Sequence, residues 1–539
     1  MTGQVSFRER LRETFTADLR SLAVVRILTG AGVVFDVLYR ARDLEAHYTQ
    51  AGVISTETAR ALVEYFGWFS LHTLSGSLAY QIGLSALFLV LGLLLMVGFA
   101  TRLVTPLCWM LYVSVQNRFF AGDYPGDYVL TLLLLSGICL PWGAWFSVDA
   151  WRGRGRAMPA PRYRGLSAHA FFLLFTVFLC NTGISKFAAG DRWLDGKALY
   201  LTLSSIRYTS HWLDWTLEHL TLLEVVTYAV PWIELVSPVV LFFPWKNGGV
   251  RTLAVAIICA MFTSFGIGLD LHQLPFLAAV AYLGFLPPWF WDRFLPALSR
   301  GAWWRAPPSE EAVSHDLALA PGRVFVSINN GLVAVLLALH ATHYYYKIGN
   351  YGYFSTPRSP PVLVDKTLSF LKMKNIYRMF SDPRVFEQSD GWDVAPGVLA
   401  SGREINVFTG DALSFEQPKD LIQSIGGFRW RQYLTLMNWY PTWNPKNITS
   451  YHVIEYAAMR RDLARYLCRQ WNARHTGADM LVRMNLAMVI APVRYAQPKP
   501  SYRVVELLEQ AHPCEDVGAS PARGPVAAPE HLEPERAAR

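Results

Sequence analysis

The sequence contains a series of apolar segments, most of them close to 20 residues long, and these limit the possible folds more than any other feature. About 20 apolar residues let an α-helix cross the ~30 Å hydrocarbon core of a bilayer. The composition agrees, because 52% of the 539 residues are hydrophobic and 17% are charged, whereas ordinary soluble proteins carry about 25% charge. The sequence therefore predicts a polytopic α-helical membrane protein.

Nine such segments occur between residues 21 and 346, which we predict to form the transmembrane domain. The first 20 residues contain four arginines and no apolar core of a cleavable signal peptide, so the first span is expected to direct insertion itself. The nine predicted spans are Leu22–Tyr39, Gln81–Thr101, Leu103–Val115, Gly126–Trp145, Ala168–Phe187, Leu223–Phe243, Thr252–Leu269, Leu274–Trp291 and Val324–Tyr346.

The basic residues predict the orientation of these spans. Five arginines lie between residues 152 and 164, and the N-terminal arginines, Arg102 and Arg251 belong to the same side if the spans alternate. Lys and Arg are enriched in cytoplasmic loops, so residues 1–20 are predicted to be cytoplasmic. Nine spans then place the end of the fifth span, and the chain after Tyr346, on the extracytoplasmic side.

The composition changes after residue 346, where a second domain is predicted. Residues 390–411 are typical of short strands interrupted by Gly and Asp, and Tyr451–Trp471 has amphipathic helical spacing. Residues 347–513 are therefore expected to form an extracytoplasmic α+β domain, and 514–539 a disordered tail rich in Pro, Ala, Glu and Arg. Cys468 and Cys514 could pair if this region is extracytoplasmic, but the sequence alone does not establish the pairing.

Several classes of function lose support from the sequence. The net charge is +8, but the basic residues lie beside apolar segments and form no stripe with interleaved aromatics, which argues against nucleic-acid binding. The sequence has no CxxC pair or His/Cys cluster with metal-ligand spacing, so no metal is expected. It also lacks the GxSxG, HExxH, P-loop and dinucleotide-binding motifs in a strand–turn–helix context.

Lys186 is the main candidate for chemistry, because it ends the apolar part of the fifth span. A cation in that position is either a functional group or an anchor whose ammonium reaches the membrane interface. In the first interpretation, burial disfavours the charged ammonium and leaves an amine that can take a proton from a weak acid such as a hydroquinone. Both interpretations remain open at this stage.

Other polar residues are candidates for the rim of a site around Lys186. Trp193, Asp195 and Gly196 follow it in a dense polar loop. Asn117 and Asp127 belong to another polar stretch, beyond the third predicted span. In each case a solvated loop is the alternative interpretation.

Acids in or beside the apolar segments are candidates for a proton relay or for structural ion pairs. Glu234 lies within the sixth span, whereas Asp270 and His272 lie in the short turn between the seventh and eighth spans. Arg26 is a candidate structural partner for one of the buried acids. For His272 the alternative is an ordinary loop histidine.

Five sequence stretches follow one another in the order RILTGAGVVFDVLYRARDLEAHYTQAGVIS, SVQNRFFAGDYPGDYVLTLLL, CLPWGAWFSVDAW, NTGISKFAAGDRWLDGKALY and SFGIGLDLHQLPFLAAVAYLGFLPPWFWD. In this order they resemble segments of vitamin K-dependent γ-carboxylase and of the bacterial HTTM (horizontally transferred transmembrane) domain proteins. The resemblance covers roughly residues 21–291, and more loosely 352–495.

The resemblance implies a function for Lys186. In the alignment, Lys186 corresponds to the family's lysine that is thought to deprotonate vitamin K hydroquinone. Trp193 and Gly196 correspond to the Trp and Gly that follow this lysine in the family. The reaction implied uses a reduced quinone (menaquinol type), O2 and CO2 to carboxylate a glutamate of a peptide substrate. The resemblance also implies that the protein is located in the bacterial inner membrane, where membrane lipids surround it.

The chain also departs from the carboxylase pattern. Ser185 replaces a second lysine, and the positions of two family histidines fall near Asp127 and Phe262. The resemblance therefore supports a relationship of fold more than identity of reaction. Two hypotheses follow: a carboxylase-like membrane enzyme with Lys186 as base, and a non-catalytic scaffold or maturation/export factor for a secreted peptide.

Overall fold

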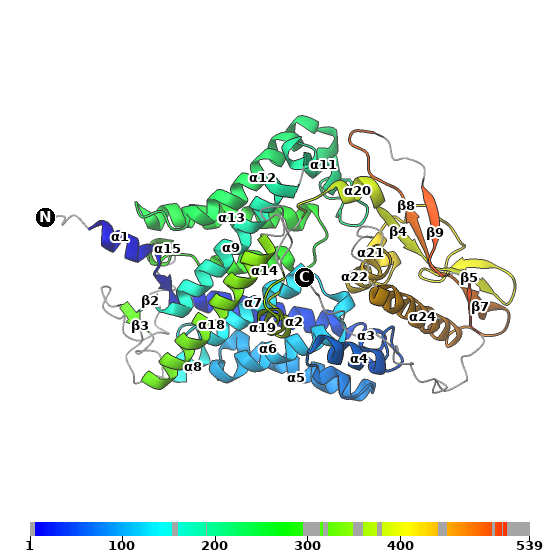
Figure 1. The fold of residues 1–539 in the computed structure, drawn as a ribbon, viewed down its shortest axis with the longest axis horizontal. Coiled ribbons are helices and arrows are strands. Elements are labelled where there is room, and N and C mark those ends of the chain that lie inside the picture. The colour runs from blue at the N-terminus through cyan, green and yellow to red at the C-terminus, as the bar shows by residue number, and fades with distance from the viewer. Residues whose placement is uncertain are drawn as a thin grey trace, which may run out of the picture.

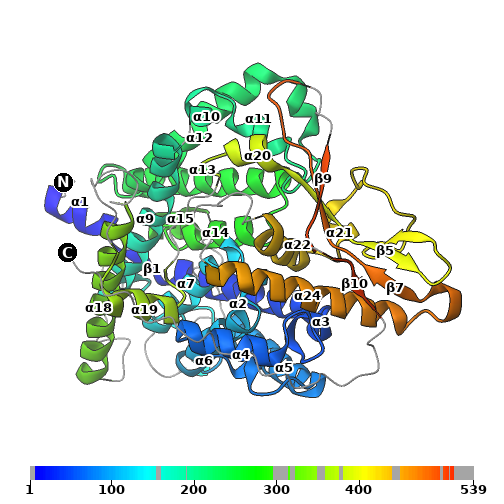
Figure 2. The same ribbon diagram turned by 45° about the vertical axis from the view of Figure 1, so that its right-hand side comes forward.

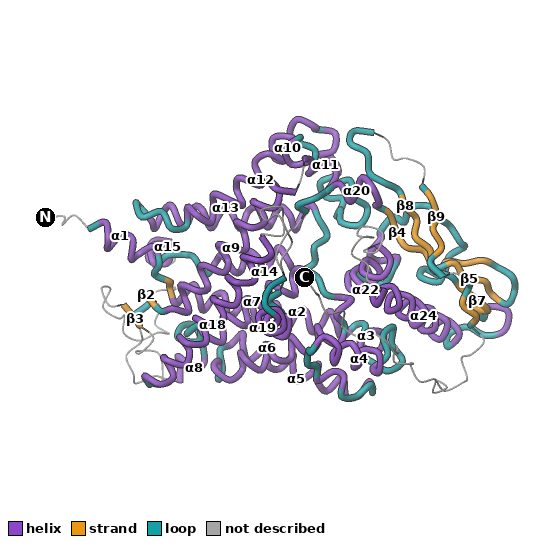
Figure 3. Tube along the Cα trace, in the orientation of Figure 1, coloured by secondary structure: helices purple, strands orange, loops and turns teal. Residues whose placement is uncertain are grey.

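The molecule is elongated, with a helical bundle in the middle and most of its strands at one end (Figures 1 and 3). The N-terminal helix α1, Phe7–Thr14, lies at the opposite end. The computed structural model describes residues 6–152, 160–189, 191–294, 313–315, 322–348, 359–374, 380–439, 450–497, 502–508 and 510–514.

Within these residues, six helices are long and apolar enough to cross a membrane, which makes the chain a helical membrane protein. A seventh span is possible if α14 (Leu274–Leu283) and α15 (Pro288–Phe294) count as one, although a 92° bend separates them. The six helices are α2 (Leu19–Ala41), α5 (Leu78–Val97), α9 (Leu166–Ala189), α12 (Leu220–Val240), α13 (Asn247–Gly268) and α18 (Arg323–Ile348).

Three predicted spans differ from these six helices. The segment Leu274–Trp291 is not one straight helix, since Pro287 and Pro288 follow its first half and a proline cannot continue the preceding helix. The third predicted span is α6 (Thr101–Arg118), whose last turns bury Gln116, Asn117 and Arg118 inside the protein. The fourth is α7 (Pro125–Cys139), an apolar helix of 15 residues, shorter than a full span.

The bundle helices pack through their apolar faces, and small residues allow close contacts between them. Helix α2 contacts α5, α7 and α14, and α9 contacts α12. The crossing of α2 and α5 is close because a Cβ atom at Gly30 would lie 2.8 Å from the backbone nitrogen of Met96. Small residues permit such approaches between membrane helices. Helix α18 is mostly exposed and lies at the periphery, against α9 and α19 (Val362–Phe370).

Short elements connect the bundle helices and cover its ends. A small sheet joins β1 to β2 antiparallel and β2 to β3 parallel, which brings the start of the first span beside two later loops. These elements are β1 (Ala17–Asp18), α3 (Leu44–Tyr48), α4 (Thr56–Phe66), α8 (Val148–Arg152), β2 (Arg162–Arg164), α10 (Asp191–Leu194), α11 (Ala198–Leu203) and β3 (Val313–His315), with 3-10 turns at Leu71–Thr73, Phe120–Gly122 and Asp214–Glu218. A further 3-10 turn, Gly477–Asp479, belongs to the C-terminal region.

The C-terminal region contains both strands and helices, as the sequence predicted. Its two sheets have the strand orders β10-β7-β5-β6 and β4-β8-β9, with antiparallel pairing. Its elements are α20 (Arg384–Ser389), β4 (Gly391–Val394), β5 (Pro396–Leu399), β6 (Glu404–Asn406), α21 (Leu421–Ser424), α22 (Phe428–Leu434), the π-helical turn Thr435–Trp439, α24 (Ser450–Asn472), β7 (Leu481–Met484), β8 (Ala487–Ile490), β9 (Arg503–Glu506) and β10 (His512–Pro513).

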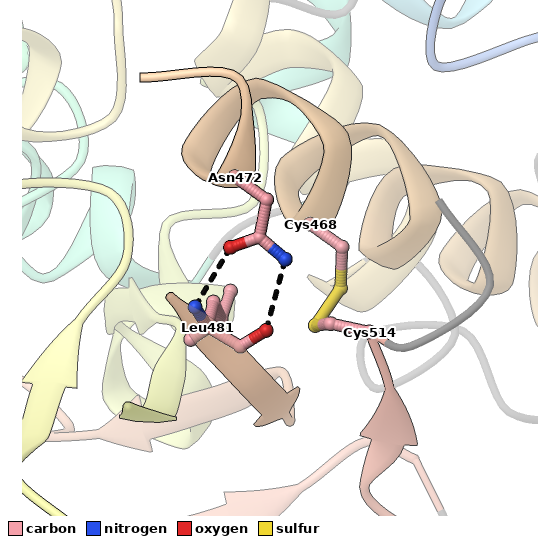
Figure 4. The surroundings of a disulfide bond; sticks show 4 residues. All are labelled: Cys468, Asn472, Leu481 and Cys514. Carbon is pink, nitrogen blue, oxygen red and sulfur yellow. Dashed lines mark hydrogen bonds between the residues drawn. A yellow bond between two sulfur atoms is a disulfide. The ribbon is translucent and has the colours of Figure 1, made fainter. Parts of the chain in front are cut away.

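A disulfide between Cys468 and Cys514 joins α24 to the end of β10 (Figure 4). One helical turn further, the Asn472 side chain accepts a hydrogen bond from the Leu481 backbone N–H and donates one to its carbonyl. The structure thus contains the pairing that the sequence left open. Cys514 is the first residue of the predicted tail, and it is buried; residues 515–539 lie outside the described part of the chain.

The C-terminal region packs on the bundle through α22 and α24, which lie beside α2 and α3 in both ribbon views (Figure 2). The Tyr39 hydroxyl accepts a 2.8 Å hydrogen bond from the backbone N–H of Phe428, and Trp430 donates to Asp43. On the other side of this contact, Arg192 in α10 forms a 2.7 Å ion pair with Glu387 in α20. The C-terminal region is therefore attached to the bundle at two separate places.

Candidate functional site

Lys186 is buried and paired with Glu234, which the sequence had identified as a candidate relay or structural acid. Its Nζ lies 2.9 Å and 2.7 Å from the two carboxylate oxygens of Glu234. The Lys186 and Glu234 side chains are 2% and 1% exposed. An anchoring lysine would extend its ammonium to water, so this burial argues against the anchor interpretation.

The pair forms because helices α9 and α12 approach closely at Gly183. A Cβ atom at this position would lie 2.9 Å from the Pro231 carbonyl oxygen and 3.1 Å from the Leu235 backbone nitrogen. Glycine therefore allows the α9 backbone to approach one turn of α12. Lys186 lies three residues after Gly183 and Glu234 three residues after Pro231, so each is about one turn from this contact.

Trp193, a predicted rim residue, covers the buried amine. Lys186 Nζ lies 5.2 Å from the centroid of the Trp193 ring, within the range of a cation–π contact. The indole Nε1–H donates a 2.8 Å hydrogen bond to the carbonyl oxygen of Phe380, at the edge of the C-terminal region. Trp193 therefore separates the ion pair from solvent and links it to the C-terminal region.

The two other residues predicted for this loop have different roles. Gly196 has a φ of +74°, and a Cβ atom there would lie 2.6 Å from Glu224 Cγ, so both the turn and the close packing on α12 require glycine. Asp195 is 44% exposed and interacts with Arg192 and Lys197 at the surface. Gly196 thus shapes the loop, whereas Asp195 lies outside the buried site.

The Lys186–Glu234 pair can exist in two protonation forms. One is ammonium with carboxylate; the other is amine with carboxylic acid, and they differ by the transfer of one proton across the 2.7 Å Nζ–Oε2 contact. Burial makes two separate charges costly unless they are paired. Glu234 is therefore suited both to hold the ammonium and to take its proton.

A cavity of about 330 Å³, here called the interface cavity, lies where the bundle meets the C-terminal region. Phe380 connects this cavity to Lys186, since its side chain belongs to the lining and its carbonyl accepts the bond from Trp193. Lys186 is not in the lining. The cavity is lined by Tyr124, Pro125, Tyr208, Leu271, Leu274, Phe380, Ser381, Asp382, Val385, Phe386, Phe428, Arg431 and Gln432.

Leu271 lines the interface cavity, and Asp270 and His272 are its two neighbours in the sequence. The His272 ring lies 4.3 Å from that of Tyr39 and 4.8 Å from that of Phe428, between centroids. Among the described residues its buried Nε2 has no hydrogen-bond partner. Burial and the nearby Arg429 charge lower the pKa of His272 to about 3, so the imidazole is neutral at physiological pH.

A hydrogen bond to its backbone holds Asp270 beside Leu271. Its carbonyl oxygen accepts a 2.8 Å hydrogen bond from Arg431. Burial raises the pKa of the Asp270 carboxyl, and the Arg431 guanidinium lowers it in part. Asp270 and His272 line a separate cavity of about 520 Å³, which shares Leu271 with the interface cavity, and neither is an ion-pair partner of Lys186.

Asp127 belongs to a second buried site, here called the four-charge cluster, with Asp36, Arg40 and Arg429. Asp127 lies 3.1 Å from Arg40 and 2.6 Å from Arg429. Asp36 lies 2.6 Å from Arg40 and 2.5 Å from Arg429, and all four side chains are at most 4% exposed. Arg429 comes from α22, so the cluster joins the C-terminal region to the bundle.

Two predictions about polar residues need correction. Arg26 pairs with no acid among the described residues; its guanidinium donates to the backbone carbonyl oxygens of Leu95, Met96, Trp142 and Phe146. Asn117 donates a 2.7 Å hydrogen bond to the carbonyl oxygen of Phe69 and thereby fixes a loop. Arg26 thus binds carbonyl oxygens of the last turn of α5 and of the loop that follows α7.

Arg40 and Arg429 were missed as site residues in the sequence analysis. Arg429 follows Asp36 by 393 positions, and the only signal for it in the sequence is a charged residue within an aromatic stretch, FRWRQY.

Comparison of the chain with models of protein families, with curated proteins and with solved structures finds no match.

Proposed function

We propose that this chain is a membrane enzyme that removes a proton from a weakly acidic, apolar substrate, with Lys186 as the base. The observation that supports the proposal is the buried Lys186–Glu234 pair beneath Trp193. A lysine amine acts as a base only when it is kept from water and can lose its own proton. Burial of the pair supports the first condition, and the Glu234 carboxylate offers an acceptor for the ammonium proton. The resemblance to γ-carboxylase gives the reaction class: quinol- and O2-dependent carboxylation of a peptide.

The topology that we propose has nine spans, including α6, α7 and the bent α14–α15 pair, with a cytoplasmic N-terminus. The C-terminal α+β domain and the Lys186 end of α9 then lie on the extracytoplasmic side. The Cys468–Cys514 disulfide supports this assignment, because disulfides persist in the periplasm and are rare in the cytosol. The bacterial inner membrane remains the proposed location.

The interface cavity suits the ring of a reduced quinone. Tyr124, Phe380 and Phe428 offer aromatic walls, and Arg431 offers guanidinium donors for a hydroxyl or developing oxyanion. When bound, a reduced quinone supplies the acidic hydroxyl. Trp193 keeps bulk water from Lys186 and stands between the amine and Phe380.

In the proton step, Glu234 first takes one proton from the Lys186 ammonium and becomes a carboxylic acid. The neutral amine then accepts the substrate proton and becomes ammonium again, leaving the substrate as an anion. Return of the Glu234 proton to solvent or product closes the cycle. The internal transfer leaves the pair neutral, uptake of the substrate proton gives it one positive charge opposite the substrate anion, and loss of the Glu234 proton makes the pair neutral again.

The test uses the full chain in lipid nanodiscs with menaquinol, bicarbonate, O2 and a glutamate-containing peptide. The double variant Lys186→Met/Glu234→Met removes both charges, so no single charge stays buried and unpaired. We expect quinol oxidation to fall by ~10²-fold or more, as for loss of a general base. Lys372→Met/Asp123→Met is the matched control, because Lys372 and Asp123 form another buried ion pair, 3.2 Å apart.

An unchanged rate of quinol oxidation in the double variant would remove the enzymatic proposal. The second candidate, a non-catalytic scaffold or maturation factor for a secreted peptide, would then be favoured. It has its own supporting observation, since Lys186 is fully paired and does not line the interface cavity. A scaffold would bind its peptide equally well with the pair intact or replaced by two methionines.

A further inference from the structure

A large cavity lies at the end of the molecule opposite the C-terminal region. It has a volume of about 750 Å³ and is here called the basal cavity. Figure 1 shows its main elements, α1, α15 and the start of α13, together near the N-terminus. Its lining consists of Arg10, Glu13, Thr16, Arg162, Pro244, Lys246, Asn247, Gly248, Gly249, Val250, Leu253, Pro287, Pro288 and Trp289.

The charged groups of the basal cavity come from three separate segments and are mostly positive. Arg10 lies on α1, Arg162 on β2 and Lys246 at the start of α13, against one carboxylate, Glu13. Because these segments are far apart in the sequence, the cations meet only through the fold. The first turn of α13 adds its partial positive charge to the same wall.

The other wall of the cavity is apolar and exposed. Leu253 is 62% exposed and Trp289 43% exposed. Leu253 belongs to a membrane-spanning helix, α13, and lies fewer than two turns after its first residue. The cavity therefore extends from the aqueous end of a span to the beginning of its lipid-facing surface.

Helix α1 beside the cavity has the character of an interfacial helix. It presents exposed Phe7 and Leu11 among arginines, and the Phe7 ring lies 5.7 Å from that of Trp245, which is itself 50% exposed. Amphipathic basic helices of this kind lie in the headgroup layer of a membrane. The basal cavity is thus placed at headgroup depth.

We propose that the basal cavity binds the phosphate headgroup of an anionic phospholipid. The cations of the cavity contact the phosphate, and the acyl chains run over Leu253 and Trp289 toward the bilayer. The volume is within the range of small-molecule sites, about 300–1,000 Å³, and exceeds what a single phosphate needs. A membrane lipid is favoured over a soluble phosphate because charged and lipid-exposed walls meet in one cavity.

The test compares the full chain in nanodiscs of phosphatidylcholine with nanodiscs that also contain phosphatidylglycerol, using bound lipid counted by native mass spectrometry and the Tm. We expect selective retention of phosphatidylglycerol and a Tm that rises with its fraction, as for any ligand of the native state. In the Arg10→Gln/Lys246→Gln variant, the preference for phosphatidylglycerol over phosphatidylcholine should fall more than tenfold, because each cation contributes about fivefold to binding of the anionic lipid. Arg8→Gln/Arg12→Gln is the matched control, since both arginines are on α1 and outside the lining.

A steric variant tests the cavity without changing any charge. A Cβ atom at Gly249 meets nothing within 4 Å, so Gly249→Leu places a side chain in the cavity without a clash. Gly83→Leu is its control, because Gly83 is equally open but lies on α5. Retention of phosphatidylglycerol should fall in Gly249→Leu alone.

Three results would overturn the proposal. The first is equal retention of the two lipids by the unchanged chain. The second is equal retention of phosphatidylglycerol by Gly249→Leu and Gly83→Leu. The third is protection by soluble glycerol phosphate as strong as that by phosphatidylglycerol, which would assign the cavity to a free phosphate compound.

Discussion

Two buried charged sites in the bundle differ in the cation they use. The Lys186–Glu234 pair has one amine and one carboxylate, whereas the four-charge cluster has two guanidinium groups and two carboxylates. An arginine stays charged in proteins, but a buried lysine can give up its proton. The cluster is therefore suited to hold structure together, and the pair is suited to proton transfer.

The two sites also differ in where their members come from. Lys186 and Glu234 belong to adjacent helices, α9 and α12. Arg429 enters the four-charge cluster from the C-terminal region and contacts both Asp36 and Asp127. Loss of the cluster should weaken the attachment of the C-terminal region at α22, while loss of the pair should leave that attachment unchanged.

The largest effect is expected from Arg429→Met, which leaves two buried carboxylates facing Arg40 alone. Removing one partner of a buried ion network costs ~3–5 kcal/mol, so the free energy of unfolding should fall by that amount in a urea titration. The control is Arg403→Met, whose ion pair with Asp479 is about 60% exposed and should contribute ~0–1 kcal/mol. Equal effects of the two substitutions would show that the cluster does not join the regions.

Next in size are single and double substitutions of the pair. Lys186→Met alone leaves the buried Glu234 without its cation and should destabilise the chain by ~3 kcal/mol or more. Adding Glu234→Met should recover most of that loss, because no buried charge remains unpaired. A double variant no more stable than the single variant would contradict the assignment of Glu234 as the partner.

The disulfide gives a smaller, local effect. Cys468 and Cys514 are separated by 46 positions, and a cross-link of such a loop contributes ~2–4 kcal/mol. Cys468→Ser/Cys514→Ser should lower the Tm of the C-terminal region, followed by its tryptophan fluorescence, and make it insensitive to reductant. A Tm of the unchanged chain that does not respond to reductant would oppose this role.

His272, which lies near Arg429, should make the stability of the fold around the four-charge cluster depend on pH. The pKa of His272 falls from 6.5 to about 3 on folding, so the unfolded chain binds the extra proton between these values and stability declines as the pH falls. Between pH 7 and pH 5 the loss is ~2 kcal/mol. His272→Phe should remove that part of the pH dependence measured by urea unfolding; an unaltered profile would contradict the shift.

The smallest effect is expected at the surface, beside the pair. Asp195 is 44% exposed in its contacts with Arg192 and Lys197, so Asp195→Ala should change the free energy of unfolding by less than ~1 kcal/mol. Quinol oxidation should also stay within twofold of the unchanged chain. A large loss of activity would bring the surface loop into the site.

The sequence predicted the elements whose signal is local. Apolar length identified the six long helices, and alternation with turn residues identified strands β4 to β6. The break after Leu283 was not predicted, although Pro287 and Pro288 are a local signal for it. Helices α6 and α7 are less distinct, because polar or short helices inside a bundle lack the hydropathy of a lipid-facing span.

The side-chain partners were harder to predict than the elements. Glu234 was recognised as a buried acid, but its contact with Lys186 depends on the close approach at Gly183, which periodicity does not reveal. Arg26 was a reasonable partner for an acid by its spacing, and the carbonyl oxygens that it contacts come from the end of α5 and from the loop after α7. Contacts across the chain arise from the packing of helices, so they become visible only in the fold.

The central claim is that the Lys186–Glu234 pair exchanges a proton with the substrate. Infrared difference spectroscopy of the nanodisc sample, before and after addition of menaquinol without O2, reports the protonation of carboxyl groups directly. The account predicts a new protonated-carboxyl band that is absent in Glu234→Gln and in Lys186→Met. A spectrum without that band, or a band that persists in both variants, would contradict it.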